Sequence, residues 1–306
     1  MKLENAVDEF IMDKRLKNLS EATITNYRKV LNELSDEHGG TELIEFNPEI
    51  ARCFLNHLQT RENKNDGSIG LSRASLELYY RVIHNFGKWC AIQNYIKSPP
   101  TEKIPKPKTD NKLPEAISDE NLEILFEILE SKASFRIQVI FEFFLDTGCR
   151  VSEVVGLNVK DVHLDNGWAM IRGKGNREDI IPLGQSLTID LHKYLYDIRP
   201  KLDSQGKKAA FFLTNRGDRY SRSGLSMLVR RYLTEAGVDG KVGPHKLRHT
   251  FATNYLRFHG DLESLRRIMR HSSVQTTQRY IALLPEDLIR AHQKASPLDN
   301  FRRRKN

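Results

Sequence analysis

The amino-acid sequence predicts a mainly α-helical protein with a small antiparallel β-sheet in its second half, arranged as two domains. Apolar residues recur at intervals of three and four along most of the chain, which is the spacing of one face of an amphipathic helix. Residues 159–183 depart from that spacing, because short apolar runs alternate there with turn sequences. Between the two helical regions, residues 98–117 are rich in proline, which excludes a continuous helix and predicts a linker.

The first domain is expected over residues 1–97 as a four-helix unit. An apolar stripe runs from Leu3 to Leu16, and Ser20 is a suitable N-cap for a second helix. Pro48 fits the first turn of a third helix, and Ser72 fits the cap of a fourth. Exposed basic residues on this unit, such as Arg73 and Arg81, are either a solvated helix face or a surface for a polyanion.

The linker at residues 98–117 is basic as well as proline-rich, with lysines that include Lys106 and Lys108. A chain of this composition is stiff and extended. It can be a neutral spacer between domains, or it can lie along a phosphate backbone and allow both domains to close around a duplex. The linker alone favours neither interpretation.

The second domain is expected over residues 118–295 as an α+β unit, followed by a basic tail at residues 296–306. The sequence Asp165-Asn166-Gly167 between apolar runs predicts a β-hairpin. Lys174 stands between two glycines on a second predicted turn, where it is either an ordinary turn residue or a functional lysine. The pattern of a nucleotide-binding P-loop is missing around it.

Composition limits the class of partner. The chain has 306 residues and a formal net charge of +8, with a pI near 9.3, which favours a polyanion. Its three widely spaced cysteines predict neither a disulfide framework nor a zinc motif, and they suit a reducing compartment. We expect a cytoplasmic, nucleoid-associated protein without a membrane partner, since no apolar run is long enough to span a bilayer.

A cluster of cations and one phenol stands out between His245 and Tyr280. His245 and Arg248 are three residues apart in an apolar-periodic segment, so they share one helix face. His271 and Tyr280 follow at short range, and no carboxylate stands among these four. A site made of cationic side chains and one phenol suits an anionic substrate. Tyr280 is the obvious nucleophile, and the predicted substrate is a DNA phosphodiester.

A metal site is the alternative for part of this segment. His245 and His249 have the spacing of two zinc ligands on a helix. Position 246 is lysine where a zinc protease has glutamate, and no third ligand is evident. The sequence therefore predicts no metal site.

The order of Arg150, Lys174, His245, Arg248, His271 and Tyr280 along the chain, and the sequences around them, resemble those of the tyrosine recombinase (phage integrase) family. The matching segments are T-G-C-R-V-S-E-V-V-G-L around Arg150, G-K-G-N-R-E-D around Lys174, H-K-L-R-H-T from His245, and H-S-S-V-Q-T-T-Q-R-Y from His271. The resemblance covers nearly the whole chain, and the first domain resembles the family's core-binding, SAM-like domain. The layout is most similar to the Xer-type recombinases. Arg270 departs from the pattern, since the family usually has glycine there.

The resemblance implies an enzyme in which Tyr280 attacks a phosphodiester and forms a 3′-phosphotyrosyl link. Arg150 and Arg248 would bind the non-bridging oxygens, and Lys174 would protonate the departing 5′-oxygen. His245 would assist proton transfer from Tyr280, and His271 would hydrogen-bond the phosphate. Glu153 would be an accessory residue that orients a neighbour such as Arg150 or His245. The covalent link conserves bond energy, so neither a cofactor nor a metal is expected.

The resemblance also implies partners. These are double-stranded DNA with a specific core site, and a homo- or hetero-tetramer that exchanges strands through a Holliday junction. Chromosome dimer resolution and integration or excision of a mobile element both fit, as do two alternatives, a catalytically silent DNA-binding relative and a type IB topoisomerase-like activity. The residues expected to contact DNA are Arg73, Arg81, Lys106, Lys108, Arg219 and Arg222.

Overall fold

The chain divides into two compact units, residues 1–112 and 113–306. The computed structural model describes residues 1–38, 40, 42–62, 67–108, 115–173, 178–203, 205–258 and 260–270. Each unit is described by itself. In the part of the chain so described, no helix is both long enough and apolar enough to cross a membrane.

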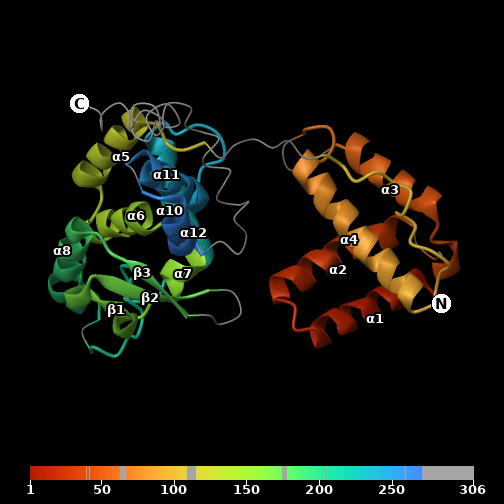
Figure 1. The fold of residues 1–306 in the computed structure, drawn as a ribbon, viewed down its shortest axis with the longest axis horizontal. Helices are drawn as coiled ribbons and strands as arrows, with labels where there is room; N and C mark the ends of the chain where they lie inside the picture. Colours follow the sequence, from red (N-terminus) through yellow and green to blue (C-terminus); the bar gives the residue numbers. More distant parts are fainter. Residues whose placement is uncertain are drawn as a thin grey trace, which may run out of the picture. The chain divides into compact units, whose positions relative to one another are not determined.

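The first unit is a bundle of four helices, as the sequence predicts (Figure 1). Each of the last three begins at a side-chain cap: Ser20 accepts a hydrogen bond from the backbone of Thr23, Asn47 precedes a proline, and Ser72 accepts from Ser75. The helices are α1 (Leu3–Leu16), α2 (Glu21–Glu37), α3 (Pro48–Thr60) and α4 (Arg73–Ile92), with a 3-10 turn η1 (Leu43–Glu45) between α2 and α3.

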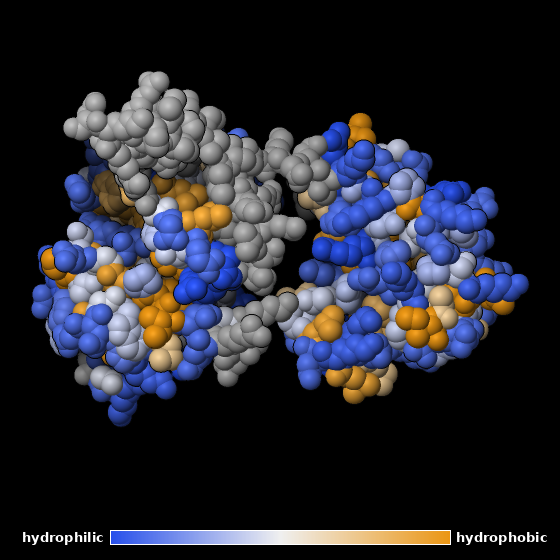
Figure 2. All heavy atoms as spheres, in the orientation of Figure 1, coloured by the Kyte–Doolittle hydropathy of each residue, from blue (hydrophilic) through white to orange (hydrophobic). Residues whose placement is uncertain are grey.

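An aromatic cluster joins the first and fourth of these helices. The rings of Phe86 and Trp89 on α4 both meet Phe10 on α1 edge-on, with ring centroids 5.4 and 5.5 Å away. Edge-to-face contacts of this kind add to the stabilisation that burial supplies. The face of the first unit that Figure 2 shows is mostly hydrophilic, with scattered apolar residues. A polar surface over an apolar core leaves the exposed basic side chains of the unit in contact with solvent.

The second unit is built around α6 (Phe135–Thr147), most of whose residues are buried. A helix with so many buried apolar residues is stable only when other elements cover it, and α6 packs most extensively against α11 (Pro244–Arg257). The other helices are α5 (Asp119–Lys132), α7 (Val151–Gly156), α8 (Gln185–Lys193), α9 (Arg199–Leu202), α10 (Arg222–Glu235), α11 (Pro244–Arg257) and α12 (Leu262–Met269). Between α8 and α9 the chain forms a π-helical turn, η4 (Tyr194–Ile198).

A three-stranded antiparallel sheet lies against these helices, in the order β1-β2-β3 (Figure 1). Its strands are β1 (Val162–His163), β2 (Trp168–Arg172) and β3 (Glu178–Pro182), with 3-10 turns η2 (Val159–Asp161) and η3 (Leu164–Asn166) before and after β1. The predicted hairpin is confirmed. Gly167 follows η3 at φ +66°, a conformation that favours glycine. Ala169 pairs with Ile181, and both side chains are buried against the helices.

Candidate active site

The site begins at the glycine that ends α6. Gly148 adopts φ +58°, a left-handed cap, and its N–H donates to the carbonyl of Phe144 at 3.0 Å. The reversal brings the chain directly into α7, with Arg150 as the residue before its first turn. A side chain at position 148 would meet the ring of Phe251 on α11, so α6, α7 and α11 come close together at this point.

Glu153 holds Arg150 in place. Its carboxylate accepts from the backbone N–H of Arg150 at 2.7 Å and from Nη1 of the same arginine at 3.0 Å. The Glu153 side chain is only 2% exposed, whereas that of Arg150 is 39% exposed. The buried carboxylate therefore fixes the position of the arginine from the protein interior, while part of the guanidinium remains accessible to a ligand.

Arg248 projects from α11 toward the same place. Its Nη1 donates to the carbonyl of Gly148 and its Nη2 to the carbonyl of Met269, each at 2.5 Å. The residue is 4% exposed. One guanidinium thus ties the end of α6 and the end of α12 to α11, and a planar group held by both terminal nitrogens has a fixed orientation.

The charges at the site influence one another. Burial, followed by the nearby charge of Arg150, lowers the pKa of Arg248 to about 10, so this guanidinium is still cationic at pH 7. Burial and then the charges of Arg248 and Arg150 lower the pKa of His245, so this imidazole is neutral at pH 7. The structure therefore brings Arg150, Arg248 and His245 within electrostatic range of one another, with Glu153 beneath them.

Arg270 is part of the same cluster, although the sequence identified it only as a departure from the family pattern. Its Nη2 donates to Glu153 at 2.6 Å and also approaches the sulfur of Cys149. The four side chains Arg150, Arg248, Arg270 and Glu153 carry three positive charges and one negative charge, so their sum is +2. An excess of positive charge in a partly buried site suits a phosphate.

Three of the predicted catalytic residues, Lys174, His271 and Tyr280, lie outside the described residues. In the part of the chain that the structure does describe, no group of three or more His, Cys, Asp or Glu side chains is arranged to hold a metal ion.

The candidate DNA contacts in the first unit are exposed. Arg73 is the first residue of α4, and Arg81 lies two turns further along that helix. Lys106 is exposed and pairs with Glu77 at 2.9 Å, and Lys108 is exposed as well. These side chains are accessible to a polyanion, and Glu77 partly neutralises one of them.

The two candidates in the second unit differ from each other. Arg222 is exposed at the first turn of α10. Arg219 donates to the carbonyls of Val155 and Leu157 at the end of α7, and to Asn158 Oδ1 at 2.6 Å. Arg219 is thus bound within the protein, in a position that stabilises the end of α7.

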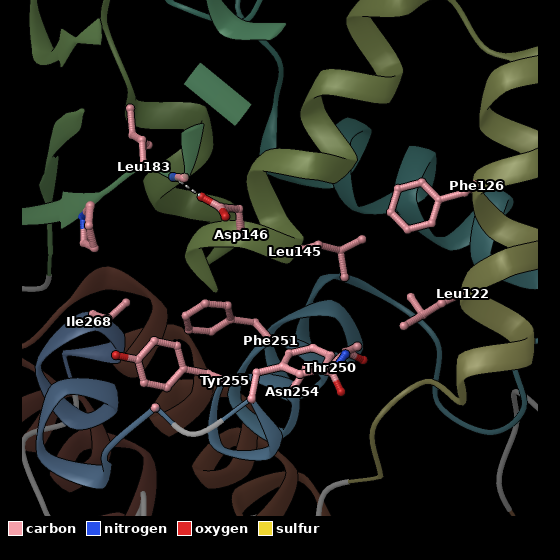
Figure 3. Close-up of a pocket in the computed structure, with 14 residues that line it drawn as sticks. Leu122, Phe126, Leu145, Asp146, Leu183, Thr250, Phe251, Asn254, Tyr255 and Ile268 are labelled. Carbon is pink, nitrogen blue, oxygen red and sulfur yellow. Dashed lines mark hydrogen bonds between the residues drawn. The ribbon is translucent and has the colours of Figure 1, made fainter. Parts of the chain in front are cut away.

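An apolar groove of about 620 Å³ lies on another side of α11. Figure 3 shows Phe126 from α5, Phe251 and Tyr255 from α11, and Ile268 from α12 around it. Neither arginine of the candidate site lines this groove, and its surface is mainly apolar. It is therefore a place for an apolar segment rather than for a phosphate.

The sequence matches a protein family and known proteins, and these matches cover most of the chain. Residues 115–287 match the model of the phage integrase family. The tyrosine recombinase XerD of Staphylococcus epidermidis is 33% identical over 269 residues, which are 86% of this chain and 88% of that protein. The tyrosine recombinase XerC of Oceanobacillus iheyensis is 30% identical over 306 residues, 97% of this chain and 98% of the relative.

Solved structures share the fold. The XerA recombinase crystal structure is 26% identical, with a TM-score of 0.52 over 96% of this chain and 99% of that one. The XerH site-specific recombinase bound to palindromic difH substrate, in a post-cleavage complex, is 23% identical, with a TM-score of 0.71 and coverage of 94% of this chain and 82% of the other. The match of the family model to more than half of the chain, together with these full-length relatives, shows that the protein belongs to the phage integrase family of tyrosine recombinases.

Proposed function

We propose that this protein is a site-specific DNA recombinase that cuts and rejoins double-stranded DNA through a 3′-phosphotyrosyl intermediate. One observation carries the proposal. Arg150 and Arg248, far apart in sequence, are held at a single glycine turn, one by Glu153 and the other by the carbonyl of Gly148. Two guanidiniums fixed in this way suit the two non-bridging oxygens of a phosphodiester.

In the proposed reaction, the phenolic oxygen of Tyr280 attacks the scissile phosphorus and the bond to the 5′-oxygen breaks. The neutral imidazole of His245 accepts the phenolic proton, which its lowered pKa permits at pH 7. Lys174 gives a proton to the leaving 5′-oxygen, and His271 hydrogen-bonds the phosphate. The reverse attack by the 5′-hydroxyl of another duplex restores a phosphodiester and releases the tyrosine.

Positive charge would be supplied mainly by the two arginines. Because the carbonyls of Gly148 and Met269 fix the Arg248 guanidinium, little reorganisation is needed as charge develops on the phosphate. Arg150 is the more exposed of the two arginines, so an entering phosphate would contact it first. Glu153 orients Arg150 and takes no part in bond making.

Recombination by this family requires two DNA sites, and we propose a tetramer, either of this chain alone or with a partner recombinase. The apolar groove beside α11 supports the proposal, because residues 284–292, an amphipathic stretch of the sequence, come after α12, whose Ile268 lines that groove. This segment from one subunit would occupy the groove of the next. Deleting residues 286–306 would then leave binding to a single site intact and abolish the pairing of two sites in a gel-shift assay. Paired complexes that persist after the deletion would contradict the docking.

The proposed role on the chromosome, Xer-like dimer resolution or movement of a mobile element, depends on the core site. Curated relatives include proteins named XerC as well as XerD, so both kinds of partnership fit. On either role the protein would act on DNA in the cytoplasm, at the nucleoid.

The proposal is tested with a duplex selected by binding from a random pool, then nicked so that cleavage cannot be reversed. Wild-type protein in EDTA should form a covalent protein–DNA band on a denaturing gel. Tyr280→Phe should bind the duplex and form no band. Absence of a band with the wild-type protein on a duplex that it binds tightly would contradict a DNA-cutting function.

A further inference from the structure

Arg270 has an unusual backbone conformation for its residue type. It caps the C-terminus of α12 at φ +54° and ψ +47°, in the left-handed region that L side chains rarely adopt. Glycine would adopt this conformation without strain. An arginine in this conformation is strained, and such strain persists only where other contacts of the residue outweigh it.

The contacts of Arg270 are buried and specific. The side chain is 7% exposed, and its Nη2 donates to Oε2 of Glu153 at 2.6 Å. Its Nη1 donates to the carbonyl of Ile268 at 2.6 Å. Nε is buried and donates to no acceptor among the described residues, so the two terminal nitrogens alone hold the guanidinium.

Glu153 therefore serves two arginines at once. Oε1 accepts from Nη1 of Arg150, and Oε2 accepts from the backbone of Arg150 and from Arg270. Without Arg270, Arg150 would be the one arginine hydrogen-bonded to the buried carboxylate, with Arg248 as the other nearby cation, and more of the charge that Arg150 offers to a phosphate would be cancelled. Burial tends to raise the pKa of Glu153, but Arg270 and then Arg150 lower it below its usual value, so the carboxylate is charged at pH 7.

Arg270 also helps to fix the end of α12. The preceding residue, Met269, accepts a hydrogen bond from Arg248 through its carbonyl. Two consecutive residues are thus attached to the site, one through the main chain to α11 and one through the side chain to α7. The residue that follows is His271, so this double attachment determines where the chain leaves α12.

We propose that Arg270 is a positioning residue of the recombination site, which neutralises Glu153 so that Arg150 presents its full charge to the scissile phosphate. This inference rests on the proposed function. Among the described residues, the side chain of Arg270 contacts Glu153, Cys149 and the carbonyl of Ile268, so it acts on Arg150 through Glu153.

The test is a double-mutant cycle measured as single-turnover cleavage of the nicked duplex. Arg270→Gly removes the guanidinium and suits the backbone, and it should cleave about 10- to 100-fold more slowly, the range typical of partners that orient a functional group. Glu153→Gln removes the charge that needs neutralising. The double variant Arg270→Gly with Glu153→Gln should therefore cleave within about threefold of Glu153→Gln alone.

Two further variants separate this role from a structural one. Arg270→Lys keeps the positive charge and loses the planar guanidinium with its paired donors. Its cleavage rate should lie between those of wild type and Arg270→Gly. Arg267→Ala removes an exposed arginine, paired with Glu263, from the same helix, and it should cleave like wild type. Thermal melts of all variants identify any that unfold. If Arg270→Gly does not fold, a folded Arg270→Gln decides, because glutamine removes the charge and keeps a polar side chain: slower cleavage supports the inference and unchanged cleavage overturns it.

The outcomes distinguish this inference from the proposed function. A wild-type protein that cleaves, beside an Arg270→Gly variant that is equally fast or whose loss of rate is just as large in the Glu153→Gln background, overturns the role of Arg270 and leaves the recombinase intact. A wild-type protein that binds the duplex and never cleaves it overturns both.

Discussion

Arg248 donates a hydrogen bond to the carbonyl of Gly148 across one hundred residues of sequence, at 2.5 Å. The contact is buried, and it places the C-terminus of α6 directly beside α11. Arg150, the N-cap of α7, follows Gly148 by two residues, so the same contact sets the distance between the two arginines. The geometry of the proposed phosphate site depends on this one turn, and the first prediction concerns it.

Gly148→Ala should destabilise the second unit and reduce cleavage. The substitution forces alanine into φ +58° and places its methyl group against the ring of Phe251, which should cost about 2–4 kcal/mol of unfolding free energy. Urea denaturation measures the loss. Gly156→Ala is the matched control, because a methyl group there meets open space at the end of α7. Equal stability of the two variants would contradict the tight approach of α6 and α11.

The pH dependence of cleavage should report His245. Burial and the charges of Arg248 and Arg150 lower the pKa of His245, so the imidazole becomes neutral at a lower pH than an ordinary histidine does. The cleavage rate should rise with pH, with its inflection below pH 6.5, the ordinary pKa of histidine. Arg150→Gln removes one of these charges and should move the inflection to higher pH, although the rate itself falls. Arg150→Lys retains the charge, and an inflection that moves equally in both variants would argue against an electrostatic cause.

A pair of carboxyls away from the site should make stability depend on pH. Burial, and then the charge of Asp190, raise the pKa of Glu142 on α6 to about 7. The folded protein therefore holds a proton that the unfolded chain releases at lower pH, so the contribution of Glu142 to stability is full below about pH 4.5 and is lost as pH rises through 7. Glu142→Gln should stabilise the protein at pH 8 by about 1 kcal/mol after allowance for solvent screening, with little effect at pH 4.5.

Urea unfolding at the two pH values tests this prediction. Glu123→Gln on the exposed face of α5 is the control, since its side chain lies in solvent. A gain for Glu142→Gln that is the same at both pH values would show that the proton is not the cause.

Arg219 and Arg222 should respond differently to the same change. Arg219→Gln removes donors to Val155, Leu157 and Asn158, and it should cost about 1 kcal/mol of stability at this exposed position. Arg222→Gln should leave stability within about 0.5 kcal/mol and weaken DNA binding, with the slope of log affinity against log salt smaller by about one. Salt titrations and urea unfolding on both variants decide. If Arg219→Gln also lowers the slope by one without loss of stability, its guanidinium contacts phosphate instead.

Much of the fold could be predicted because local chemistry determines it. Ser20 and Ser72 cap helices where the sequence places them, and the Asp-Asn-Gly hairpin forms because Gly167 supplies a positive φ. The four helices of the first unit and the three-stranded sheet follow from apolar periodicity in the same way. Such features depend on neighbours within a few residues, which is the range over which sequence patterns are informative.

Features that depend on distant partners could not be predicted. The π-helical turn begins at Tyr194, whose phenol donates to the carbonyl of Phe211 and accepts from the N–H of Leu213, contacts that no local pattern indicates. The pairing of Arg270 with Glu153 joins residues 117 positions apart, and no local pattern indicates which carboxylate an arginine will meet. The resemblance to a family supplied the residue types of the site, whereas their mutual contacts required the structure.

The nucleophile is the central claim, and the measurement that tests it most directly is peptide mapping of the covalent adduct. Wild-type protein trapped on the nicked duplex would be digested with nuclease and then with trypsin, and the modified peptide sequenced by mass spectrometry. We predict one nucleotide attached through its 3′-phosphate to Tyr280, within the peptide that follows Arg279. A nucleotide attached to any other residue, or attached through a 5′-phosphate, would contradict the assignment of Tyr280 and the direction of the proposed reaction.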